Sequence, residues 1–241
     1  MGADHTRAGH GASRKSRVRL VDDHPIVREG LARVIDQEPD LAVCGTAVNA
    51  RQALDAIEAA APDIAIVDVS LDGSHGIELV KELKTRHPGL HVLMLSMHDE
   101  SLYAERALRA GAKGYVMKRE PPQKLLAAIR GVVAGRLYFS EAVTASVLEH
   151  VAGTKRGAAL LPMDKLSDRE LQILELIGRG RTTRQIAEEL HVSVKTIQAH
   201  REHLKEKLQL DGATALARFA VSWVESERGT HATGTAPPQR G

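Results

Sequence analysis

Between residues 17 and 135, five short apolar runs alternate with five segments of helical length. The predicted strands are Val18–Val21, Leu41–Gly45, Ile64–Val67, Val92–Leu95 and Gly114–Val116, and the predicted helices lie near residues 26–37, 49–60, 75–86, 100–110 and 121–134. Runs such as IAIVDV and HVLMLS are apolar at nearly every position, which is typical of strands that are covered on both faces. The alternation therefore predicts an α/β fold in which a five-stranded parallel sheet lies between two layers of helices.

The pattern changes after residue 135, and the chain of 241 residues is predicted to hold two domains. The first covers residues 17–135, and the second, which is helical throughout, covers residues 161–226. Residues 136–160 are predicted to form a linker that contains a helix. We expect disordered tails at residues 1–16 and 227–241, which are rich in small and polar residues.

The composition excludes several classes of protein. A single cysteine, Cys44, rules out an internal disulfide framework and zinc sites that are built on paired cysteines. No apolar run approaches the roughly 18 residues of a membrane span, and the N-terminus lacks the apolar core of a secretory signal. We therefore expect a cytoplasmic protein with no membrane partner. The net charge of +2 does not by itself indicate a partner.

Charged and hydroxyl side chains follow the predicted strands at their carboxyl ends, where open parallel sheets bind ligands. These residues are Asp22 and Asp23 after the first strand, Asp68 after the third, Ser96 after the fourth and Lys118 after the fifth. Close carboxylates repel each other by on the order of 4 kcal/mol per pair at an effective dielectric constant near 20, so a hard divalent cation, Mg²⁺ or Mn²⁺, is expected. A carboxylate beside such an ion can attack phosphorus and become an aspartyl phosphate.

The stretches VDDHPIVREGL, IVDVSLDGSHGIEL, LMLSMHDE and ALRAGAKGYVMK resemble the receiver domain of two-component response regulators. The resemblance implies a flavodoxin-like fold with the strand order 2-1-3-4-5, and it assigns Asp68 as the phospho-acceptor. It also implies that Ser96 and Tyr115 move toward the site on phosphorylation. The remaining implied roles are metal ligation by Asp22, Asp23 and the backbone carbonyl of Ser70, and stabilisation of the phosphate or switching by Ser96, Tyr115 and Lys118.

The C-terminal region carries three signals for the start of a helix. Ser167 with Glu170, and Thr182 with Gln185, have the spacing of capping boxes, and Ser193 is a further candidate cap. The second and third predicted helices are separated by only a few residues, which is the spacing of a helix-turn-helix. The same spacing also suits a helical bundle that binds protein, so the spacing alone leaves both interpretations open.

The segment from Leu166 to about Trp223 resembles the LuxR/NarL-type helix-turn-helix domain, through LSDRE, IAEEL, S-x-K-T and KL. The resemblance implies a domain of four helices that inserts the helix at 194–208 into the major groove of DNA, while the helix at about 211–224 mediates pairing. The expected contacts are to phosphates by Lys195, Thr196, Arg201 and Lys205, and to base edges by Gln198 and Ala199.

Together the two resemblances predict a transcription regulator of a two-component system that is not an enzyme. A sensor histidine kinase would phosphorylate Asp68 with Mg²⁺ present, and the first domain would then change its pairing or free the recognition helix from occlusion. A homodimer would bind an inverted-repeat promoter site on double-stranded DNA, with RNA polymerase as a further partner. Two alternatives remain: a Mg²⁺-dependent phosphohydrolase with its nucleophile on the first strand, and a phospho-dependent protein-binding adaptor.

Overall fold

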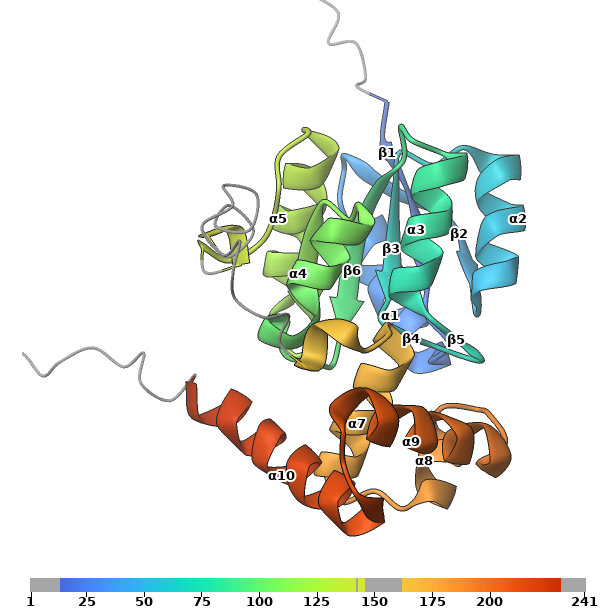
Figure 1. Ribbon diagram of the computed structural model, residues 1–241. Coiled ribbons are helices and arrows are strands. Elements are labelled where there is room, and N and C mark those ends of the chain that lie inside the picture. The colour runs from blue at the N-terminus through green and yellow to red at the C-terminus, as the bar shows by residue number, and fades with distance from the viewer. Residues whose placement is uncertain (1–13, 142, 146–161, 231–241) are drawn as a thin grey trace, which may run out of the picture.

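The computed structural model of the chain describes residues 14–141, 143–145 and 162–230, so most of the predicted tails and linker falls outside the described residues. The first part, which we call the sheet domain, contains β1 (Ser16–Val21), α1 (Pro25–Asp36), β2 (Leu41–Ala47), α2 (Ala50–Ala60), β3 (Ile64–Asp68), β4 (Ser70–Leu71), β5 (Ser74–His75), α3 (Gly76–Arg86), β6 (His91–Ser96), α4 (Glu100–Ala110), β7 (Gly114–Met117) and α5 (Pro122–Val133). The second part, which we call the helical domain, contains the 3₁₀-helix η1 (Pro162–Lys165) and the helices α7 (Asp168–Gly178), α8 (Thr183–Glu189), α9 (Val194–Leu208) and α10 (Gly212–Thr230). The two domains lie against each other (Figure 1).

The five strands of the main sheet are parallel and follow the order β2-β1-β3-β6-β7, which confirms the predicted topology. Each predicted strand occurs and is longer than predicted by one or two residues in total. The small antiparallel hairpin of β4 and β5 was not predicted, because strands of two residues are too short to show a period. Gly73, with φ at +70°, forms the turn of this hairpin.

Helices cover both faces of the sheet, as its apolar strands require. On one face, Ile35 of α1 and Ile129 of α5 pack against strand residues such as Ile66. On the other face, the core includes buried side chains of α2, α3 and α4, such as Tyr103, and it continues without a break into the core of the helical domain, for example at Leu174 of α7. The two domains therefore share a core on the side of the sheet that carries α3 and α4.

The three predicted helix starts of the helical domain are confirmed. Ser167 and Thr182 each form a complete capping box, and the Ser193 side chain accepts a hydrogen bond from the backbone N–H of Thr196 at 3.0 Å. The last helix, α10, continues to Thr230, past its predicted end near residue 224. Within the described ranges, neither α10 nor any other helix combines the length and the apolar character that a membrane crossing requires.

Gly178, at the end of α7, lets α7 and α10 approach closely. A Cβ atom at this position would lie inside the van der Waals distance of the Ala220 carbonyl oxygen on α10. We predict that Gly178→Ala lowers the free energy of unfolding of the helical domain by about 1–3 kcal/mol, because backbone must shift to admit the methyl group. Urea unfolding followed by circular dichroism measures the change.

Gly30→Ala on α1 is the matched control, because no atom lies within 4 Å of its new methyl group. The higher helix propensity of alanine should stabilise this variant by about 0.5–1 kcal/mol. Equal stability of the Gly178→Ala variant and the unsubstituted protein would contradict the close contact between α7 and α10.

Candidate functional site

The predicted acidic residues meet at the carboxyl ends of the strands. Asp22, Asp23 and His24 follow β1, Asp68 ends β3, and one donor atom from each of these four side chains lies within 4.8 Å of the others. Lys118, after β7, places its Nζ 2.6 Å from Asp68 Oδ2 and 2.7 Å from Asp22 Oδ2. The structure thus brings together the side chains that the sequence places on three separate strands.

Burial dominates the electrostatics of this cluster. Asp68 is 3% exposed, and its burial, opposed by Lys118 and reinforced by Asp22, raises its pKa from 3.8 to about 6. Burial acts to lower the pKa of Lys118, but the attraction of Asp68 and Asp22 outweighs it and holds the pKa above its ordinary value. Lys118 therefore stays charged at neutral pH and bridges two carboxylates.

The donor set of the cluster fits a hard cation. Three carboxylates share the space with one ammonium group, Lys118, so negative charge is in excess. Asp23 Oδ1 is buried and has no hydrogen bond within the described part of the chain. His24 Nδ1 lies 2.6 Å away, but the two groups are not aligned for a hydrogen bond. Carboxylate oxygens in this number could hold a divalent metal ion of the kind that prefers oxygen ligands.

Ser70 and Ser96 lie beside the cluster in different ways. The Ser70 backbone N–H donates to Asp68 Oδ1 at 3.3 Å, which fixes the start of β4 next to the acidic group. Ser96 is fully buried at the end of β6, and its Oγ accepts a hydrogen bond from the backbone N–H of His98 at 2.9 Å. Both residues thus lie in strands next to Asp68, Ser70 at the start of β4 and Ser96 at the end of β6.

Tyr115 is buried next to the cluster. Its side chain is 3% exposed, and its hydroxyl donates to the backbone carbonyl of His98 at 3.1 Å. The movement toward Asp68 on phosphorylation that the family resemblance implies for Ser96 and Tyr115 stays a prediction.

Helix α7 of the helical domain docks on the sheet domain through buried charges. Asp168 is the anchor: Lys81 Nζ lies 3.0 Å from its Oδ2, and Arg106 Nη1 donates to its Oδ1 at 3.0 Å. Burial acts to raise the pKa of Asp168, but nearby His75, Lys81 and Arg106 outweigh it and lower the pKa. Arg106 also donates to the backbone carbonyl of Leu166 at 2.8 Å. The sequence did not predict this docking of α7 on the sheet domain.

The DNA-contact residues predicted on α9 divide into two groups. The side chains of Lys195, Thr196, Gln198 and Ala199 are exposed, so the sheet domain does not cover them in this structure. Arg201 and Lys205 are half-buried, and Lys205 Nζ lies 2.6 Å from Glu202 Oε2. Among the predicted basic contacts, Lys195 near the N-terminal end of α9 is therefore the exposed one.

A second group of donor atoms lies inside the helical domain. Glu170 of α7 and the histidines His200 and His203 of α9 have donor atoms within 4.8 Å of one another. The Glu170 carboxylate, however, already accepts from Lys207 Nζ at 2.6 Å and from the Ser167 backbone N–H at 2.7 Å. We assign this group to the packing of α7 on α9, because Lys207 provides the cation that Glu170 needs.

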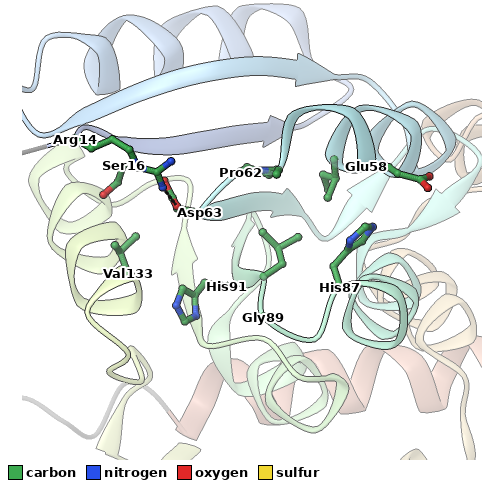
Figure 2. A pocket seen from close by; sticks show the side chains of 12 residues that line it. Arg14, Ser16, Glu58, Pro62, Asp63, His87, Gly89, His91 and Val133 are labelled. Carbon is green, nitrogen blue, oxygen red and sulfur yellow. Dashed lines mark hydrogen bonds and ion pairs between the residues drawn. The ribbon is translucent and has the colours of Figure 1, made fainter.

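The opposite end of the sheet holds a cavity of different character. A space of about 520 Å³ opens at the amino ends of the strands, beside the start of β3 (Figure 2). Asp63 is tied there to Arg14 and accepts from the Arg17 backbone N–H at 2.7 Å. The acidic cluster at the carboxyl ends, and not this cavity, therefore has the donor set for chemistry.

Comparison with known proteins agrees with this arrangement. Residues 18–130 match the family described as the response regulator receiver domain, and residues 164–220 match the bacterial regulatory proteins of the luxR family. The chain belongs to the LuxR family of two-component response regulators. It is 35% identical over 209 residues to the oxygen regulatory protein NreC of Staphylococcus carnosus, which covers 85% of this chain and 96% of that protein.

Two solved structures of the family are similar to this chain. A LuxR-family response regulator from Aurantimonas sp. SI85-9A1 shares 37% identity with a TM-score of 0.52, and the match covers 57% of this chain and 99% of that chain. RcsB from Salmonella enterica serovar Typhimurium, bound to promoter rprA with the phosphomimetic BeF₃⁻, shares 25% identity with a TM-score of 0.56, and the match covers 86% of this chain and 99% of that chain. The predicted family and fold class are confirmed.

The raised pKa of Asp68 makes a prediction about stability. A carboxyl group whose pKa is higher in the folded than in the unfolded chain destabilises the fold once the pH rises through that window. Without metal at pH 7.5, we expect Asp68→Asn to raise the free energy of unfolding by about 1–3 kcal/mol. The gain should shrink as the pH falls from about 6 to 3.8, where the carboxyl group becomes protonated in both states.

Urea titrations in a chelator at several pH values measure this gain. Asp55→Asn, at an exposed position on α2, is the control and should change stability little at any pH. A gain for Asp68→Asn that did not vary between pH 7.5 and 4 would contradict the burial of an ionised carboxylate.

Proposed function

We propose that phosphorylation of Asp68 by a sensor histidine kinase switches this response regulator. The observation that carries the proposal is the convergence of Asp68, Asp22 and Lys118 in a buried cluster. An oxygen of the Asp68 carboxylate attacks the phosphorus of a phosphohistidine, the P–N bond breaks, and its electron pair stays with the imidazole. A pKa of about 6 leaves Asp68 mostly ionised at neutral pH, which the attack requires.

The other residues of the cluster would bind and neutralise the transferred group. Asp22, Asp23, Asp68 and the backbone carbonyl of Ser70 would hold Mg²⁺, or alternatively Mn²⁺, which when bound supplies positive charge for the phosphoryl oxygens. Lys118 would turn from its bridge between the carboxylates toward a phosphoryl oxygen. The Ser96 hydroxyl, which now accepts from the backbone N–H of His98 and interacts with the Tyr115 hydroxyl, would turn to donate to another phosphoryl oxygen.

The output that we propose is regulated binding to promoter DNA. A homodimer would bind an inverted-repeat site on double-stranded DNA through α9, as the symmetry of helix-turn-helix proteins favours, and RNA polymerase would be a further partner. The RcsB structure bound to promoter DNA in the presence of a phosphomimetic supports this proposal. The protein would act in the cytoplasm, with residues 17–135 as the receiver and residues 161–226 as the DNA-binding domain.

We propose no turnover of an external substrate. The alternative, a phosphohydrolase with its nucleophile on β1, would use Asp22 and not Asp68 as the attacking carboxylate. Acetyl phosphate with Mg²⁺ tests the switch: intact-mass spectrometry should find one added phosphoryl group, which Asp68→Asn abolishes. Turnover that depended on Asp22 and not on Asp68 would favour the phosphohydrolase.

The exposed N-terminal end of α9 yields a prediction for DNA binding. We expect Lys195→Ala to weaken binding for all sequences and to reduce the slope of log affinity against log salt by about 1, because one phosphate contact is lost. Gln198→Ala should instead cost on the order of 1–3 kcal/mol at one base pair and relax the preference there. Gel shifts on DNA from upstream of the protein's own gene measure both effects.

Arg51→Ala, which removes an exposed cation from α2 in the sheet domain, is the matched control and should leave binding unchanged. Full DNA binding by both α9 variants would contradict the proposed interface and favour the protein-binding adaptor.

A further inference from the structure

We infer that α7 of the helical domain restrains the phosphorylation site, with Gln172 and Glu175 as positioning residues that hold the segments beside Asp68 in their unphosphorylated arrangement. The inference rests on the proposed function of Asp68 and deepens it, because it names the contact through which the two domains would regulate each other. Both residues lie on α7 and are buried against the sheet domain.

Gln172 reaches the first of these segments. Its Nε2 donates to Ser70 Oγ at 2.7 Å, across 102 positions of sequence. Ser70 in turn donates its backbone N–H to Asp68 Oδ1 at 3.3 Å. A single residue therefore separates α7 from the carboxylate that would be phosphorylated, and it is the residue whose carbonyl is expected to face the metal ion.

Glu175 reaches the second segment through His98. Its Oε2 accepts from the Tyr103 hydroxyl at 3.0 Å and lies 2.8 Å from His98 Nδ1, a close contact that is not aligned as a hydrogen bond. Glu175 is 1% exposed, so this charge relies on the sheet domain for much of its compensation. Arg179, on α7 itself, pairs with the other oxygen of Glu175.

His98 joins the two segments to each other and to the switch residues. Its Nε2 lies 3.2 Å from Ser70 Oγ, so the contacts of Gln172 and Glu175 meet at one point. Its backbone N–H donates to Ser96 Oγ, and its carbonyl accepts from Tyr115. A shift of Ser96 toward a phosphoryl oxygen would therefore move His98, and with it the partner of Glu175.

The direction of the effect follows from linkage. The docked α7 holds Ser70 and His98 in the arrangement that belongs to unphosphorylated Asp68. If phosphorylation shifts Ser70 and His98, it weakens the docking of α7 on the sheet domain. By linkage, release of α7 then favours phosphorylation at equilibrium by the factor by which phosphorylation weakens the docking. Binding of DNA that draws the helical domain away should act in the same way.

The rate of phosphorylation tests this inference on the full chain. Acetyl phosphate and saturating Mg²⁺ are added to the unsubstituted protein, Gln172→Ala and Glu175→Gln, and phosphorylated protein is followed with time on phosphate-affinity gels. Glu188→Gln is the matched control, an exposed carboxylate on α8. We expect both α7 variants to be phosphorylated at least about 5-fold faster, because release of α7 raises the population of chains whose segments beside Asp68 can react, and the control to be unchanged.

Thermal unfolding of each variant separates this role from a merely structural one. A variant that is less stable but is phosphorylated at the unsubstituted rate would overturn the inference, since packing alone predicts that result. The Asp68→Asn variant shows whether the inference about α7 or the proposed phosphorylation of Asp68 has failed. Equal labelling of Asp68→Asn and the unsubstituted protein would refute phosphorylation of Asp68 itself, whereas Asp68-dependent labelling at equal rates in all α7 variants would refute only the role of Gln172 and Glu175.

Discussion

The interaction that governs the rest of this structure is the repulsion among carboxylates at the carboxyl ends of the strands, which one lysine only partly neutralises. Asp22, Asp23 and Asp68 crowd together there with Lys118 as the ammonium group that bridges two of them. Burial makes the imbalance costly, and the raised pKa of Asp68 is its direct expression. A site in this state is sensitive to the arrival of a cation or a phosphoryl group, because either one redistributes charge that water cannot screen.

The same end of the sheet is where the helical domain docks. Asp168 is held by Lys81 and Arg106, and α7 then lies over the segments that carry Ser70 and His98. The DNA-facing end of α9 stays exposed in this arrangement. Control of DNA binding would therefore act through the orientation of the helical domain, and through pairing of two copies, more than through covering of the recognition helix.

The sequence predicted the sheet and the acidic cluster, because buried strands are local patterns and strand ends converge at one edge of a parallel sheet. The strand order came from the family resemblance and not from these patterns. It did not predict the β4–β5 hairpin, whose strands are too short for a period. The role of α7 also escaped prediction: Gln172 and Glu175 are polar residues that a helical pattern places toward water, and their partners lie 102 and 72 positions away. The hydrogen bond from Tyr115 to the His98 carbonyl joins residues 17 positions apart, and no motif encodes it.

Hydrogen–deuterium exchange of the full chain with Mg²⁺, with and without beryllofluoride, tests the central claim most directly. The claim is that charge at Asp68 controls the docking of α7. It predicts that beryllofluoride increases exchange in α7 and in the facing parts of α3 and α4, and that Asp68→Asn prevents the increase. Unchanged protection of α7, together with clear protection changes around Asp68, would contradict it.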